Sequence, residues 1–217
     1  MTPHGEAPSD RETGRDHPPG VTLNTMKNAA GRVATVAAVS AITITGLAGT
    51  AFAQTSVFED AKGDMKQGAD IRKVRVVNGD EKLRINVRHD DLVRSFRSGS
   101  SIAVYIDTDR TRTGPEYVFL GATFEGGDYA LLPADGFKQD GNRQVPLHGG
   151  SYIMKLDYVE DVARIAIDQV VVGDADQVRV EVKTGAELLP EGSTTPKPAE
   201  VDWLGEPKKF TPWVAQG

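Results

Sequence analysis

Short runs of alternating apolar and charged residues constrain the fold of this chain more than any other feature of its sequence. In residues 81–89, EKLRINVRH, leucine, isoleucine and valine alternate with arginine and asparagine. Residues 177–185, QVRVEVKTG, repeat the pattern with three valines. A period of two places the apolar side chains on one face of a β-strand and the polar ones on the other. Because the apolar face needs a second layer to pack against, the pattern favours a sandwich or a barrel.

Turn signals divide the chain at the spacing expected of such folds, roughly 8–12 residues from strand to strand. Residues 78–80, Asn-Gly-Asp, predict the tight turn of a β-hairpin. Residues 102–106 are apolar on both faces, which favours a central strand. We expect strands within residues 70–78, 81–89, 100–109, 116–124, 128–135, 151–159, 162–168 and 177–185, with a weaker hairpin in 136–147.

The predicted fold is therefore all-β: an antiparallel β-sandwich of jelly-roll or immunoglobulin-like type, with about eight or nine strands. After residue 185 the chain becomes loop-like, and its prolines exclude a central strand there. We expect residues 186–217 to form a Pro-rich tail that packs back on the sandwich. Residues 54–217 have a length that suits a single domain.

The N-terminal part has the order of a secretory signal peptide in residues 26–53. Lys27 and Arg32 precede an apolar stretch, and Ala51-Phe52-Ala53 is a small-x-small cleavage site. We expect cleavage after Ala53 and secretion; the alternative is retention as an anchor, although the stretch is shorter than the ~20 residues that span a bilayer. Residues 1–25 are polar and acidic, which predicts disorder and an over-extended start, with Met26 as the true first residue.

The bulk composition excludes several classes of function. The chain has no cysteine, so disulfides, thiol nucleophiles and thiolate metal sites are excluded. Its formal net charge of −6 argues against a nucleic-acid partner, because such partners require a basic surface. We expect contact with a membrane only through the signal peptide before cleavage.

The order of motifs resembles the exported bacterial β-sandwich modules related to family 9 carbohydrate-binding modules and DOMON domains. An acidic segment, DAKGDMKQGADI, is followed by a hairpin, a strand ending in DTD, a TGPEY turn, a Gly-Gly hairpin and a final VRVEVKT strand. The resemblance covers about residues 58–213. It implies a jelly-roll-like sandwich and, in some members, a structural calcium ion, a bound sugar or a heme.

Two aspartates, Asp107 and Asp109, end the predicted central strand. Closely spaced carboxylates in a loop are typical ligands of Ca²⁺, so this pair is one candidate metal site. The spacing does not match an EF-hand. The alternative is that both side chains bond nearby backbone amides and cap the turn, as Asp residues often do.

A second acidic group lies in the segment before residue 71. Asp64 and Asp70, with Asp60 and Glu59 nearby, are candidate ligands of a cation. We expect Asp202 of the tail to approach them, because both segments flank edge strands. Carboxylates brought together in this way need a cation or raise one another's pKa. The alternative is a solvated acidic loop.

The tryptophans Trp203 and Trp213 both lie in the tail. In the sugar-binding proteins that the chain resembles, a pair of tryptophans in mid-sheet loops clamps a sugar ring, and the position of these two in the tail departs from that pattern. They are nevertheless the candidate ligand-binding residues. Exposed rings would offer a stacking surface. The alternative is that the tail uses them, with Phe210, to plug the open end of the sandwich.

These observations predict a secreted, monomeric, non-catalytic binding module whose ligand is a carbohydrate or another cell-envelope component, with Ca²⁺ as a possible stabilising ion. The first alternative is a structural or protein-interaction sandwich without a small ligand. The second is a hydrolase with an unrecognised carboxylate pair. The sequence contains no HExxH motif and no G-x-S-x-G motif, which weakens the case for an enzyme.

Overall fold

A computed structural model describes residues 54–66, 68–138, 144–195, 197 and 199–217. The expected disordered start, the signal peptide and its cleavage site therefore lie outside the described residues. Eleven strands run through the described part of the chain. Their bounds are β1 (Gln54–Glu59), β2 (Ile71–Asn78), β3 (Lys82–His89), β4 (Ser100–Asp107), β5 (Tyr117–Ala122), β6 (Tyr129–Pro133), β7 (Tyr152–Asp157), β8 (Val162–Asp168), β9 (Gln177–Ala186), β10 (Glu200–Trp203) and β11 (Val214–Ala215).

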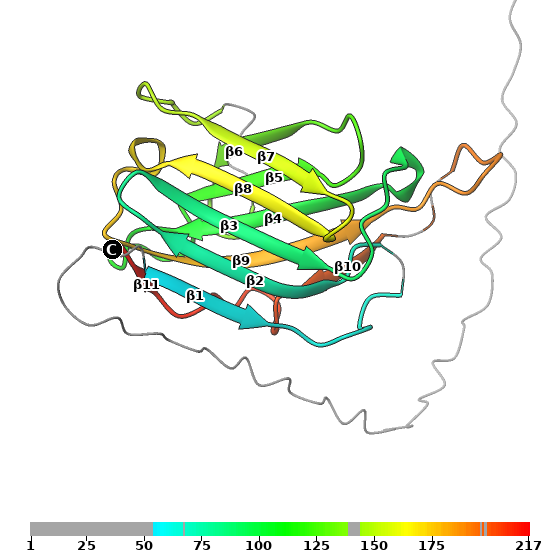
Figure 1. The fold of residues 1–217 in the computed structure, drawn as a ribbon, viewed down its shortest axis with the longest axis horizontal. Coiled ribbons are helices and arrows are strands. Elements are labelled where there is room, and N and C mark those ends of the chain that lie inside the picture. The colour runs from blue at the N-terminus through cyan, green and yellow to red at the C-terminus, as the bar shows by residue number, and fades with distance from the viewer. Residues whose placement is uncertain (1–53, 67, 139–143, 196, 198) are drawn as a thin grey trace, which may run out of the picture. The chain divides into compact units, whose positions relative to one another are not determined.

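The strands form two antiparallel sheets that pack face to face (Figure 1). The first sheet has the order β1-β2-β3-β8-β7, and the second has the order β10-β9-β4-β5-β6, with β11 also paired to β9. This arrangement confirms the predicted antiparallel sandwich. The expected central strand is confirmed as well, because β4 lies between β9 and β5. The only helical segments among the described residues are two short 3₁₀ turns, Phe96–Ser98 and Gln169–Val172.

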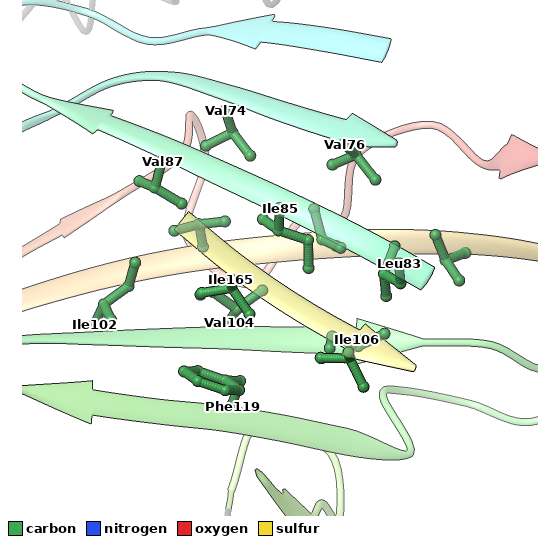
Figure 2. Close-up of a cluster of buried hydrophobic side chains, with 14 of the residues drawn as sticks. Val74, Val76, Leu83, Ile85, Val87, Ile102, Val104, Ile106, Phe119 and Ile165 are labelled. Carbon is green, nitrogen blue, oxygen red and sulfur yellow. The ribbon is translucent and has the colours of Figure 1, made fainter. Parts of the chain in front are cut away.

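The core fills the space between the sheets with the apolar side of each alternating strand. In β3, Leu83, Ile85 and Val87 are fully buried, whereas Arg84 and Arg88 on the other side of the strand face solvent. Isoleucines and valines of β4 meet them from the second sheet, as the sticks in Figure 2 show. Each such side chain contributes roughly 1.5–3 kcal/mol when it is fully buried, so the period of two that is visible in the sequence becomes the main source of stability.

The C-terminal tail packs back on the second sheet, as predicted, but not at the open end of the sandwich. Residues 200–203 pair with β9 as the edge strand β10, and β11 pairs with β9 further along. Between them, the amides of Leu204 and Thr211 donate to the carbonyls of Val182 and Val180. The tail therefore covers the edge of β9, where its prolines interrupt no inner ladder of the sheet.

A second, smaller apolar cluster lies on the outer face of this sheet. Tyr105, Val118 and Leu132 form its buried part, and Trp203 and Phe210 of the tail pack against them. The hairpin expected in residues 136–147 is not present as strands in its described flanks, and its tip lies outside the described residues. Ala134 and Phe137 instead contribute to the outer cluster.

Candidate cation site

The acidic segment between β1 and β2 folds around the carboxylate of Asp70. This side chain accepts hydrogen bonds from the amide of Gly63 at 2.9 Å and from the amide of Met65 at 3.3 Å. Asp residues readily form such bonds with nearby backbone. The loop that results holds Asp64 at its exposed surface.

Two further carboxylates come from β1 and from the tail. Asp60 directly follows β1, and its Oδ1 accepts a hydrogen bond from the amide of Gly205 at 3.0 Å. Asp202 lies in β10 with its side chain turned inward, where its Oδ2 accepts the amide of Ile71 at 2.7 Å. Asp202 is only 4% exposed. These bonds join segments that are more than a hundred residues apart in the sequence.

One carboxylate oxygen each of Asp60, Asp64 and Asp202 lies within 4.8 Å of the other two, so these residues could hold a metal ion. A small hollow of about 170 Å³ opens beside Asp64 and Asp202. The expected approach of Asp202 to the acidic segment is thus confirmed. Asp70, predicted as a ligand, is bonded to the loop amides described above and is not one of the three.

Burial and close packing raise the pKa values of all three carboxyl groups. Burial, together with neighbouring carboxylates, raises the pKa of Asp202 to about 7, although the hydrogen bond from the Ile71 amide works against the rise. Burial also raises the pKa of Asp64 to about 6, helped by its hydrogen bond to Asp70 and by the charge of Asp60. Burial raises the pKa of Asp60 as well, while its backbone hydrogen bonds lower it. A bound cation would relieve this unfavourable accumulation of negative charge.

A buried carboxyl group that the sequence did not single out lies close to this site. Glu181 of β9 is 0% exposed, and neither of its carboxyl oxygens has a hydrogen-bond partner among the described residues. Oδ2 of Asp60 is also buried without a partner. Burial, together with the charge of Asp60, raises the pKa of Glu181 to about 9. The Glu181 carboxyl group lacks the donors that normally accompany a buried carboxylate, whereas Asp60 keeps the Gly205 amide on its Oδ1 and has the charge of Arg72 nearby.

These shifts make stability depend on pH in a definite direction. For Glu181, the folded state keeps a proton up to about pH 9, whereas a glutamate in the unfolded state loses it near 4.5, so stability falls as the pH rises through that window. Asp202 acts in the same sense up to about pH 7. Burial lowers the pKa of His89 to about 4, which gives the opposite sign: stability falls as the pH drops from 6.5 toward 4.

The predicted pair Asp107 and Asp109 lies apart from the three clustered carboxylates, and its oxygens have donors from the protein. Asp107 is 0% exposed, and its Oδ2 accepts two hydrogen bonds from the guanidinium of Arg179, at 2.8 and 2.6 Å. Its Oδ1 accepts the amide of Asp109. Oδ1 of Asp109 accepts both the hydroxyl and the amide of Thr111, and these bonds lower the pKa of Asp109.

The two candidate tryptophans lie on the outer face of the second sheet with protein partners. The ring of Trp203 stacks on Tyr105, with centroids 6.3 Å apart and planes inclined by 13°. The ring of Trp213 lies beneath the guanidinium groups of Arg110 and Arg179, at 5.1 and 4.6 Å from its centroid. Both side chains are half-buried. Each ring thus already makes the kind of contact that it would offer to a sugar or a cation.

The same face of the second sheet carries an open hollow of about 750 Å³. Alternation explains its lining: Ile102 and Val104 point into the core, so their neighbours in β4 point outward. Small side chains line much of the hollow, and Asp128, Gln144 and Lys183 add polar groups to its lining. The outward-facing and bordering residues include Ser101, Ala103, Ala122, Asp128, Ala130, Gln144 and Lys183.

No family model matches the chain, and no curated protein is significantly similar to it. The resemblance to carbohydrate-binding modules therefore extends to the two-sheet antiparallel sandwich and no further. Among the described residues, no helix has the length and apolar character needed to cross a membrane.

Proposed function

We propose that this chain is an exported, non-catalytic binding module whose sandwich is stabilised by Ca²⁺ bound at Asp60, Asp64 and Asp202. The single observation that carries the proposal is the convergence of these three carboxylates to within 4.8 Å from segments far apart in the sequence. Ca²⁺ suits such a site because it accepts six to eight oxygen ligands in flexible geometry, including backbone carbonyls and waters. Mg²⁺ demands stricter octahedral geometry and gives up its waters reluctantly.

The ligand surface in this proposal is the open hollow on the outer face of β4, β5, β6 and β9. Its small side chains leave room for an extended chain to lie against the sheet, and its polar borders offer hydrogen-bond partners to hydroxyl groups. Carbohydrates, including the polysaccharides of the cell envelope, have this mixture of apolar ring faces and hydroxyl groups. The order of residues 26–53, which is that of a signal peptide, supports the proposed export.

The alternative is a structural or protein-interaction sandwich without a small ligand. It is favoured by one observation: Trp203 is stacked on Tyr105 and is half-buried, so its ring serves the fold. The two functions differ in whether the hollow takes up polysaccharide.

Thermal melts in EDTA, CaCl₂ and MgCl₂ test the metal part of the proposal. A ligand at a hundred times its dissociation constant stabilises the folded state by about 2.7 kcal/mol. For a domain of this size that raises the Tm by about 5–11 °C. We expect this rise with Ca²⁺, its loss in Asp64→Asn, and its retention in the exposed control Asp80→Asn and in Asp109→Asn. Coincident melts with and without Ca²⁺ would refute the metal site.

Affinity electrophoresis through gels that contain soluble β-glucan or xylan, with sedimentation on purified peptidoglycan, tests the ligand part. Ala130→Glu places a charged side chain in the hollow. Ile153→Glu is the matched control, because Ile153 is 42% exposed on β7 of the other sheet. The binding module is supported if a polymer in the gel slows the migration of the chain, if Ala130→Glu abolishes this effect, and if Ile153→Glu preserves it. No interaction with any of these polymers favours the interaction domain.

A further inference from the structure

The candidate cation site joins the tail to the acidic segment between β1 and β2. Asp202 belongs to β10, whereas Asp60 and Asp64 belong to the acidic segment. The other contacts between the two segments also run through carboxylates: Gly205 donates to Asp60, and Glu200 accepts the amide of Lys66 at 3.0 Å. Docking of β10 therefore brings additional negative groups toward a segment that is already acidic.

This accumulation opposes the docking of β10 unless a positive charge compensates it. When they are ionised, the carboxylates of Asp60, Asp64 and Asp202 repel one another, and Asp60 and Asp202 are partly or fully withdrawn from water. An independent observation is that carboxyl oxygens at this junction are left without hydrogen-bond donors. Glu181 is fully buried next to this junction without a partner for either oxygen, and Oδ2 of Asp60 is orphaned in the same way.

The far end of the tail is fastened by a different chemistry. Thr211 bonds to Val180 through both its amide and its hydroxyl group. The ring of Phe210 packs against Phe137 at 5.1 Å, and the guanidinium of Arg179 lies 4.7 Å above the ring of Phe210. These contacts involve no carboxylate of the tail. Residues 210–215 are thus attached without the carboxylates that hold residues 200–205, although the ring of Phe137 contacts both Phe210 and Trp203.

We propose that cation binding at Asp60, Asp64 and Asp202 acts as a clasp that fastens β10 and residues 204–205 to the sandwich, and that loss of the cation releases this part of the tail. The inference rests on the proposed calcium site. Release uncovers the edge of β9 at residues 183–186, which pair with β10, and removes Trp203 from Tyr105. An uncovered strand edge is a surface that a further strand can extend, so the clasp controls access to it.

Hydrogen exchange of the purified chain, measured with and without Ca²⁺, tests the clasp. A calorimetric titration with Ca²⁺ on the same chain measures binding of the ion directly. The amides of Leu204 and Gly205, which donate to Val182 and Asp60, report on the clasp. The amide of Thr211 is an internal control, because its bond to Val180 belongs to the other attachment. We expect Ca²⁺ to slow exchange at residues 204 and 205 by about tenfold or more and to leave Thr211 unchanged.

The outcomes separate the clasp from the calcium site itself. Calcium binding by calorimetry without a change in exchange at residues 204–205 would overturn the clasp and leave the site in place. No calcium binding would overturn both. A uniform slowing that includes Thr211 would show global stabilisation and also overturn the clasp. Asp64→Asn changes an exposed side chain and so spares the core; it should abolish the calcium effect, and Asp80→Asn should retain it.

Discussion

Replacing Arg179 by methionine should destabilise the fold by about 3 kcal/mol. Arg179 gives two hydrogen bonds, of 2.8 and 2.6 Å, to Asp107, which is 0% exposed. Its guanidinium also lies 4.7 and 4.6 Å from the ring centroids of Phe210 and Trp213. Removing one partner of a buried pair typically costs about 3–5 kcal/mol, because the other charge stays buried without compensation. We take the lower end, since the Arg179 side chain is 30% exposed.

Urea unfolding at neutral pH measures this loss, and a thermal melt should show a fall in Tm of about 6–12 °C. Arg164→Met is the matched control: its pair with Asp157 is 3.0 Å long, but the side chains are 46% and 34% exposed. Exposed pairs contribute at most about 1 kcal/mol. The double variant Asp107→Asn/Arg179→Met should recover about 1–2 kcal/mol, because no buried charge remains. Equal losses in Arg179→Met and Arg164→Met would refute this reasoning.

Three further outcomes follow from the structure. In cation-free buffer, Glu181→Gln should raise the Tm and reduce the fall in Tm between pH 6.5 and 9, because the pKa of Glu181 is about 9; an unchanged pH profile would contradict this. Ile85→Ala, at a position that is 0% exposed, should lose about 2–5 kcal/mol in urea unfolding. Gly99→Ala should lose more stability than Gly63→Ala, measured by Tm: both glycines have positive φ, but only at Gly99 would a Cβ overlap the backbone of Glu187.

The strands that could be predicted from the sequence are those whose own residues decide their structure. In β3 and β9 the alternation is complete enough to fix which face is buried, and residues 78–80 mark the turn between β2 and β3. The burial of β4 on both faces could be predicted from its uninterrupted apolar run. Local periodicity and turn residues thus predict most strands of the sandwich.

Two of the edge strands, β1 and β10, could not be predicted, because their partners rather than their sequences decide their structure. The sequence of β1, QTSVFE, is largely polar, and β10 has only four residues in a Pro-rich stretch. Both exist because β2 and β9 present unpaired backbone groups at the sheet edges. The same reason explains the partial success with the candidate site: Asp64 and the approach of Asp202 were expected from edge placement, whereas Asp107 lies beside Arg179 for reasons of tertiary packing.

Glu181 shows where alternation stops being informative. In VRVEVKT the glutamate occupies an outward position, between Arg179 and Lys183, and a period of two places such a residue in solvent. The tail then returns along β9 and covers this position, so that a carboxyl group expected in solvent is buried without any change in its own strand. A buried carboxyl group without a partner opposes the docking of the segment that buries it. The tail is therefore held against the cost of burying this carboxyl group, and the proposed cation at Asp60, Asp64 and Asp202 would offset part of the cost of keeping it docked.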